Sequence, residues 1–133
     1  MQTLFYMIEI GIKGHKEQIV TPEMSAARVG SGLVDVFATP MMVALIEQTC
    51  YESVLPHLDV GQGTVGTLVN VSHLSATPIG RRVWCDSELT EVDRRRLVFS
   101  VKAYDEAGLI GEGTHERFVI DTAKFMDKLK AKS

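Results

Sequence analysis

A single carboxylate interrupts the most apolar helical stretch of the sequence. Glu47 follows the segment 41–46, in which every side chain is apolar. Ionising a carboxylate among apolar neighbours is costly and tends to raise its pKa, and such groups are common at functional sites. Glu47 is therefore a candidate nucleophile or a candidate general base that activates a water molecule. The structural alternative is a solvent-facing stripe that Glu47 shares with Gln48.

A histidine ends a segment of alternating side chains further along the chain. The alternation places His73 on the same face as Val65, Thr67, Val69 and Val71 of a predicted strand. An imidazole has an intrinsic pKa near neutrality, which suits proton transfer to a leaving group or from water. The structural alternative is a histidine that packs on an apolar face with its hydrogen bonds satisfied.

A threonine stands where the apolar helix begins. Thr39 is a good N-cap type, worth about 1 kcal/mol, and Pro40 suits the first helical position. The N–H groups at the helix start could also polarise a carbonyl. Thr39 and Glu47 are about 12 Å apart along a continuous helix, so their side chains should not touch. Either the first turn is irregular or the two residues serve one site from different subunits; we favour the second hypothesis.

The elements that must position these residues follow from changes of period along the chain. A strand at 17–21 and a loop at 22–35 precede a buried helix at 40–54, which Pro56 ends. Four strands joined by short turns follow, and a short basic helix starts at Thr122; the strands are predicted at 65–73, 82–90, 97–104 and 109–120. Short turns favour antiparallel neighbours. The predicted class is α+β, an antiparallel sheet curled around one apolar helix.

Composition bounds the class of protein. The 133 residues predict one domain spanning 1–133, and 45% hydrophobic with 23% charged residues excludes a disordered chain. A net charge of −3 argues against nucleic-acid binding. No apolar run reaches the roughly 18–20 residues of a membrane span. The stretch 4–12 contains Glu9 and follows no Lys or Arg, unlike a secretory signal. We expect a cytoplasmic protein with neither nucleic acid nor membrane as partner.

Cysteine and histidine spacing predicts no metal site. Cys50 and Cys85 form neither a disulfide framework nor a CxxC pair, so we expect reduced packing residues. The other histidines have no ligand spacing among themselves or with the cysteines, and we expect ordinary surface or strand residues at His15, His57 and His115. No flavin or nicotinamide site is visible either.

Several short motifs spread over these elements resemble the fluoroacetyl-CoA thioesterase family. The similarity covers nearly the whole chain, from roughly residue 17 to 130, which makes chance similarity improbable. The matching positions are 35–39 (Asp-Val-Phe-Ala-Thr), Glu47, 66–67 (Gly-Thr), 70–73 (Asn-Val-Ser-His), 76–78 (Ala-Thr-Pro), Gly80, 88–89 (Glu-Leu), 94–97 (Arg-Arg-Arg-Leu) and 113–117 (Gly-Thr-His-Glu-Arg).

The resemblance implies a hot-dog fold and an acyl-CoA thioesterase in which coenzyme A is part of the substrate and no separate cofactor is needed. The family's catalytic threonine, glutamate and histidine fall on Thr39, Glu47 and His73. Glu47 would then form a mixed anhydride with the acyl group or activate water. A glycine that supports the thioester oxygen falls on Gly66, and an arginine near the acyl pocket falls on Arg117.

Each of these two residues also has a structural alternative. Gly66 could be a turn glycine with unusual dihedral angles, and Arg117 could lie on a solvated face. One departure from the family is clear. Fluoroacetate-specific members carry a longer lid with phenylalanines, whereas residues 26–35 are shorter and contain no Phe. We expect Leu33 and Phe37 to contact the acyl group instead. Fluoroacetyl specificity therefore does not follow, and the implied substrate is a short-chain acyl-CoA.

Two other functions fit the same fold. One is a non-catalytic acyl-CoA binding or sensing module, since fold does not fix function. The other is a hydratase or dehydratase, which ranks lower because the central helix lacks an Asp/His pair five residues apart. An apolar helix and exposed strand edges need burial through pairing. We therefore expect a homodimer or a tetramer.

Overall fold

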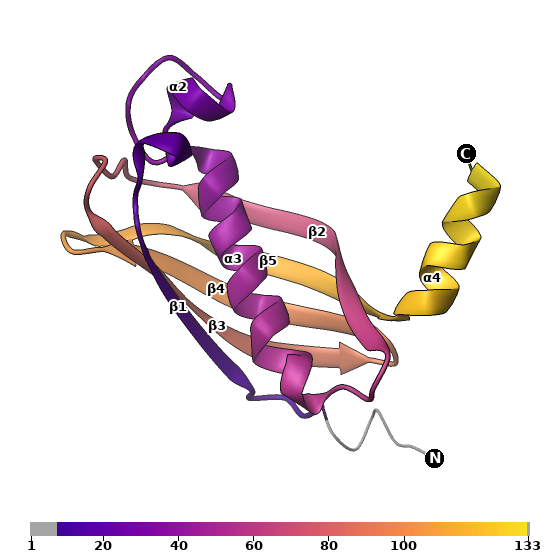
Figure 1. Ribbon diagram of the computed structural model, residues 1–133. Helices are drawn as coiled ribbons and strands as arrows, with labels where there is room; N and C mark the ends of the chain where they lie inside the picture. The colour runs from indigo at the N-terminus through magenta and orange to yellow at the C-terminus, as the bar shows by residue number, and fades with distance from the viewer. Residues whose placement is uncertain (1–7, 133) are drawn as a thin grey trace.

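One antiparallel sheet wraps around a single long helix (Figure 1). The computed structural model describes residues 8–132, so the predictions for the first residues of the chain lie outside it. The five strands lie in the order β1-β3-β4-β5-β2. Their bounds are β1 Lys13–Ile19, β2 Gln62–His73, β3 Arg82–Asp93, β4 Arg96–Asp105 and β5 Gly108–Asp121. Every neighbouring pair is antiparallel, which confirms the predicted α+β class.

The helical elements differ from the prediction in the first loop. Residues 22–35 are not a plain loop but contain η1 (Pro22–Met24) and the one-turn helix α2 (Ala26–Val29). Ser25 caps α2 by accepting a hydrogen bond from the backbone N–H of Arg28, and Gly30 ends it in the left-handed region at φ 82°. The other helices are α3 (Thr39–Val54), η2 (Leu55–His57), α4 (Thr122–Leu129) and η3 (Lys130–Lys132).

The long helix α3 begins one residue earlier than predicted. Ala38 is the N-cap, in extended conformation and without a side-chain cap. Thr39 is therefore the first helical residue and not the cap, and Pro40 is the second. The helix is α-helical throughout, so an irregular first turn is excluded. The Thr39 hydroxyl is free to bond elsewhere.

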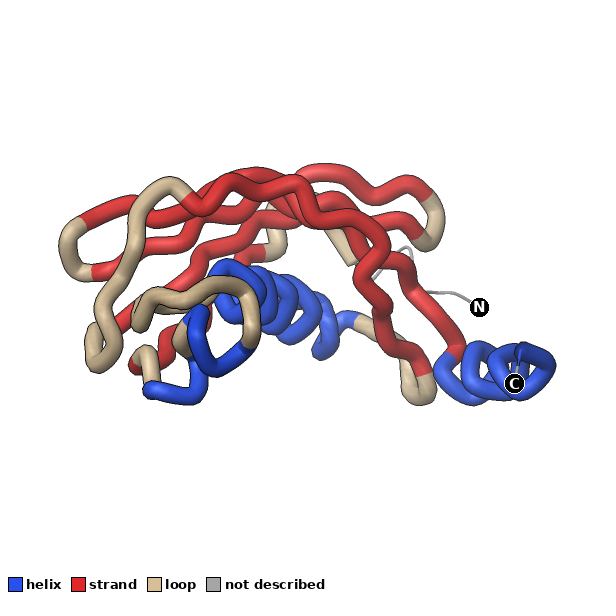
Figure 2. Tube along the Cα trace, turned by 90° about the horizontal axis from the view of Figure 1, so that it is seen from above, coloured by secondary structure: helices blue, strands red, loops and turns tan. Residues whose placement is uncertain are grey.

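The core lies between α3 and the concave face of the sheet, which arches over the helix in Figure 2. The helix buries one stripe of side chains: Met42, Leu45, Ile46, Thr49, Cys50 and Val54. Facing them are buried strand residues such as Val83, Leu97 and Phe99. The sequence predicted a helix buried on most sides, but Met41 and Val43 are only half-buried, because the sheet arches over one side of the helix (Figure 2).

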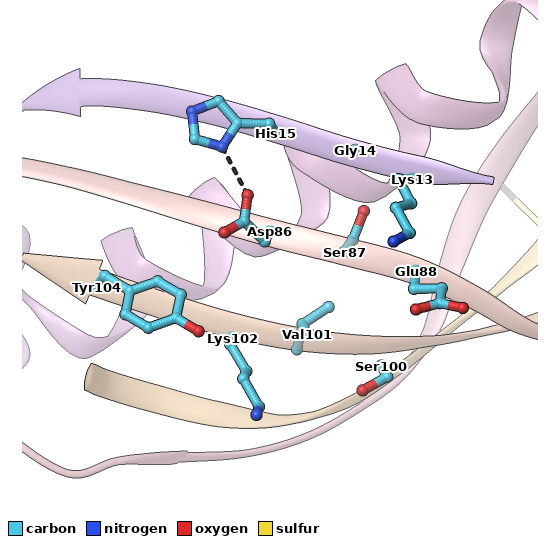
Figure 3. Close-up of a pocket in the computed structure, with 10 residues that line it drawn as sticks. All are labelled: Lys13, Gly14, His15, Asp86, Ser87, Glu88, Ser100, Val101, Lys102 and Tyr104. Carbon is cyan, nitrogen blue, oxygen red and sulfur yellow. Dashed lines mark hydrogen bonds and ion pairs between the residues drawn. The ribbon is translucent and has the colours of Figure 1, made fainter. Parts of the chain in front are cut away.

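The face of β1 and β3 that points away from α3 carries a shallow polar pocket (Figure 3). Gly14 packs on the helix, and side chains alternate along a strand, so His15 faces outward. Its Nδ1 lies 2.6 Å from Asp86 and its Nε2 lies 2.8 Å from Glu17. Both partners only accept hydrogen bonds, so this site favours the imidazolium and raises the pKa of His15.

Stability should therefore depend on pH through His15. A folded-state pKa above the unfolded value stabilises the protein below the unfolded pKa, and this contribution disappears as pH rises through the folded value. We expect the difference in unfolding free energy between the wild type and His15→Gln to be larger at about pH 5.5 than at about pH 8.5. Urea unfolding at both pH values measures it. An equal difference at both would contradict the interpretation.

Candidate active site

The first turn of α3 meets the end of β2 at a threonine–histidine pair. Thr39 Oγ1 lies 2.8 Å from His73 Nδ1. The pair lines a cavity of about 270 Å³ next to residues 74–76 and Phe37. The Phe37 ring stands edge-on to the imidazole, with centroids 6.5 Å apart. Sequence reasoning proposed both residues for one catalytic set, and the structure brings these two into contact.

The surroundings of His73 favour its neutral form. Burial lowers the pKa of His73, and the Ser75 backbone opposes this shift only in part. A neutral imidazole with a bare Nδ1 can accept the Thr39 proton, which is the arrangement that activates a hydroxyl. The other ring nitrogen, Nε2, is buried and has no hydrogen-bond partner among residues 8–132.

Glu47 lies two turns further along α3 and has different neighbours. Its side chain is 38% exposed, and Oε2 lies 3.3 Å from Arg117 Nη1. The nearest imidazole is that of His115, at 4.0 Å, and not that of His73. Within the described part of the chain no hydrogen bond or ion pair joins Glu47 to Thr39 or His73. One protomer therefore presents two separate halves of the predicted set.

Arg117 is buried and fully engaged, so the solvated-face interpretation is wrong. Its Nε donates to the Thr64 hydroxyl at 2.8 Å and its Nη2 donates to the Thr64 carbonyl at 3.1 Å. Its Nη1 points at both Glu47 and His115, at 3.3 and 3.1 Å. The guanidinium carbon lies 5.6 Å from the centre of the Tyr51 ring, one helical turn beyond Glu47. A buried cation held by this many hydrogen bonds fixes the position of the Glu47 carboxylate.

His115 belongs to this site, although spacing arguments assigned it no special role. It lies in a strand as expected, but its side chain is fully buried. Nδ1 lies 2.8 Å from the Leu68 carbonyl. Burial lowers the pKa of His115, and the neighbouring Arg117 lowers it further. The signal was available in the sequence: two positions before Arg117 on a strand is the same face.

Gly66 is required by close approach and not by a turn. It lies within β2 and is not one of the glycines with positive φ. A Cβ there would lie 2.6 Å from Glu47 Oε2 and 3.2 Å from Arg117 Nη1. The register of β2 against β5 shifts between Gly66 and Leu68. The carboxylate thus sits against a bare stretch of backbone.

Gly66→Ala should fold but lose activity. The methyl group displaces the Glu47 carboxylate, a flexible side-chain end, from its place against the strand. A misplacement of about 1 Å can cost about 10²-fold in rate. We expect kcat for thiol release to fall by about that factor, with a melting temperature close to that of the wild type. Gly63→Ala, whose Cβ meets nothing nearer than Thr122 Oγ1 at 3.3 Å, is the matched control.

The two proposed acyl-pocket residues behave differently. Phe37 is buried and lines the cavity beside Thr39. Leu33 is 96% exposed and does not line that cavity, so the structure of one protomer does not place it at the site. Among residues 8–132 no three His, Cys, Asp or Glu side chains are grouped to hold a metal ion, and no helix is long and apolar enough to cross a membrane.

Known structures share this architecture. A hot-dog-like protein from Thermanaerovibrio acidaminovorans superposes with a TM-score of 0.88 at 21% identity, over 98% of this chain and 97% of its own. A mutant of the fluoroacetyl-CoA thioesterase FlK in complex with acetyl-CoA superposes with a TM-score of 0.90 at 35% identity, over 95% and 99% of the two chains. The protein is therefore an α+β hot-dog protein, as the sequence predicted.

Sequence comparison narrows the class. The profile of the fluoroacetyl-CoA-specific thioesterase family matches residues 20–123. A fluoroacetyl-CoA thioesterase from Streptantibioticus cattleyicolor is 44% identical over 99 residues, which are 74% of this chain and 71% of that protein. The chain belongs to the fluoroacetyl-CoA-specific thioesterase family. It is a thioester hydrolase, and the prediction of an enzyme of this type is confirmed.

Proposed function

We propose that the protein hydrolyses a short-chain acyl-CoA to the free acid and coenzyme A with Thr39, Glu47 and His73 as catalytic residues. The observation that carries this proposal is the position of the Glu47 carboxylate. Its carboxylate lies against the Gly66 backbone and is held by the buried Arg117. The relative bound to acetyl-CoA supports an acyl-CoA as the substrate. Coenzyme A enters and leaves as part of the substrate.

The chemistry follows from the two halves of the site. As general base, Glu47 takes a proton from water, whose oxygen attacks the thioester carbonyl carbon, and the carbon–sulfur bond breaks. As nucleophile, Glu47 attacks that carbon itself, the carbon–sulfur bond breaks, and water then hydrolyses the mixed anhydride, which releases the acid and frees the carboxylate. We infer that the backbone N–H of Gly66 stabilises the negative charge that develops on the thioester oxygen. The Thr39 hydroxyl, which is hydrogen-bonded to His73, gives a proton to the departing thiolate. The proton that water loses as its oxygen enters the acid then restores the pair.

We propose a homodimer, or a tetramer built from it, in which one site takes Thr39 and Glu47 from different subunits. Two features support this. The helix α3 is continuous, which keeps the two residues about 12 Å apart in one protomer. Strand β2 lies at the edge of the sheet and exposes Leu68 and Val69. A long apolar edge strand invites pairing with another chain. Sedimentation analysis tests the assembly, and a monomer would contradict it.

The test of the activity is release of free thiol from a panel of acyl-CoAs. We expect turnover of acetyl-CoA and of other short-chain acyl-CoAs. The first loop, residues 22–35, contains no Phe and leaves Leu33 in solvent, so selectivity for fluoroacetyl-CoA over acetyl-CoA should be weak. Binding of acyl-CoA without thiol release from any member of the panel would instead support a sensing module. We also propose a cytoplasmic location, where coenzyme A thioesters are turned over.

A further inference from the structure

We propose that His115 is a positioning residue that aims the Arg117 guanidinium at the Glu47 carboxylate. The inference rests on the proposed function of Glu47, but the geometry that carries it belongs to His115 itself. Its Nε2 lies 3.1 Å from Arg117 Nη1, the same nitrogen that lies 3.3 Å from Glu47 Oε2. The imidazole therefore contacts the arginine directly, whereas Nε2 and Glu47 Oε2 are 4.0 Å apart, beyond hydrogen-bond range.

The hydrogen bonds of His115 assign its tautomer. Nδ1 lies 2.8 Å from the Leu68 carbonyl, which can only accept, so Nδ1 carries the proton. Nε2 faces Arg117 Nη1, which can only donate, so Nε2 carries the lone pair. Both ring nitrogens are thus satisfied only in one neutral form. His115 acts as a hydrogen-bond acceptor for the arginine and is a poor proton donor.

The sheet itself fixes this imidazole. The register shift in β2 between Gly66 and Leu68 turns the Leu68 carbonyl toward the His115 side chain. On its other side the ring stacks on Phe99 of β4, with centroids 6.3 Å apart and planes 28° apart. His115 thereby couples the irregular part of β2 to the orientation of Arg117. The same irregular stretch contains Gly66, on which the carboxylate rests.

The charges around His115 reinforce the neutral form. Arg117 on β5 opposes its protonation, and so does burial, while Glu47 on α3 and Glu116 on β5 favour protonation. Glu116 is paired with Arg96 of β4 at 2.9 Å, which weakens its influence. A proton on Nε2 would place a second cation beside Arg117 and remove its acceptor. The Arg117 guanidinium would then no longer be held in its orientation toward Glu47, so activity should fall when His115 is protonated.

Three substitutions separate the two hydrogen bonds of His115. In His115→Gln the amide oxygen reaches the position of Nε2 and can accept from Arg117. In His115→Asn the side-chain amide reaches only the position of Nδ1, where its N–H can donate to the Leu68 carbonyl. His115→Phe keeps the ring and removes both bonds. We expect kcat to fall by about 10–100-fold in the Asn and Phe variants with little change in KM. We expect kcat of the Gln variant to be at least about tenfold higher than kcat of the Asn and Phe variants.

A second measurement does not depend on activity. NMR of labelled histidines reports the tautomer and titration midpoint of His115. We expect the Nδ1–H tautomer, a midpoint below about 6.5, a higher midpoint in Arg117→Met and a lower one in Glu47→Gln. The outward-facing His15→Gln is the control, which should leave kcat and the His115 midpoint unchanged.

The outcomes distinguish the two levels of the proposal. If the wild type releases no thiol from any acyl-CoA, the proposed function fails, and the NMR response of His115 to Arg117→Met still decides the positioning role. If the wild type is active but the Gln variant loses as much kcat as the Asn variant, a merely structural role is indicated and the inference is overturned. A midpoint that ignores both Arg117→Met and Glu47→Gln overturns it as well, even if the His115 variants fail to fold.

Discussion

Glu47→Gln is expected to lower kcat for thiol release by about 10³-fold, because it removes the group that delivers oxygen to the thioester. The substitution changes little else. Glutamine has the same length, and its amide oxygen can still accept from Arg117 Nη1, which now lies 3.3 Å from Glu47 Oε2. The glutamine side chain still occupies the space beside the Gly66 backbone. The loss therefore reports the missing negative charge and nucleophilic oxygen, and the melting temperature should stay close to that of the wild type.

The measurement is steady-state thiol release from acetyl-CoA, with thermal melting as the check on folding. Glu52→Gln is the matched control. Glu52 lies on the same helix and pairs with Lys16 at 3.1 Å, but it is far from Gly66 and Arg117 in the sheet and should change kcat little. Thiol release that persists undiminished in Glu47→Gln would show that another group carries the chemistry, and the role assigned to this carboxylate would have to be abandoned.

Local signals were sufficient to predict the fold. Pro40 and Pro56 set the limits of the central helix, because proline is tolerated only near a helix start and cannot continue a helix. The turn at Arg94 and the turn before Gly108 separate strands of alternating pattern, and both residues have positive φ. Such short connections leave antiparallel pairing as the simplest sheet. The observed element boundaries differ from the predicted ones by a few residues. In β1, for example, the pairing with β3 extends the strand to Lys13.

The site was harder to predict, because its geometry depends on long-range packing. Thr39 looks like a helix cap from its neighbours alone, yet its hydroxyl bonds to His73, 34 positions away. Gly66 looks like a turn glycine, yet the constraint on it comes from the Glu47 carboxylate on a different element. His115 looks like an ordinary strand residue, because no metal-ligand spacing relates it to another His or Cys. Its burial beside Arg117 depends on how β2 and β5 pair.

Leu33 is the opposite case, a predicted acyl contact that a single protomer does not contain. Its place in the chain matched the lid of the family, and an apolar side chain there seemed suited to an acyl group. In the structure the one-turn helix α2 ends at Gly30 and the following residues turn outward, so Leu33 is in solvent. A contact between Leu33 and substrate would therefore require a second protomer, which no property of a single chain can predict.

A mixture of Thr39→Ala and Glu47→Gln protomers should recover activity that neither variant has alone. If each site takes Thr39 from one subunit and Glu47 from the other, a hybrid dimer contains one intact site and one doubly damaged site. Random exchange makes half of the dimers hybrids, so the mixture should reach about a quarter of wild-type activity. If both residues served one site within a subunit, every site in every dimer would lack one of them.

The experiment combines the two purified variants at equal concentration, exchanges their subunits in mild denaturant and measures thiol release after refolding. Wild type treated in the same way corrects for losses on refolding. Thr39→Ser provides the control for the hydroxyl, since it keeps the hydrogen bond to His73 and should retain most activity as a homodimer. A mixture that contains hybrid dimers by mass spectrometry but shows no recovery would refute the shared site. Since α3 is continuous and holds Thr39 and Glu47 two turns apart, the substrate would then have to bridge that distance within one protomer.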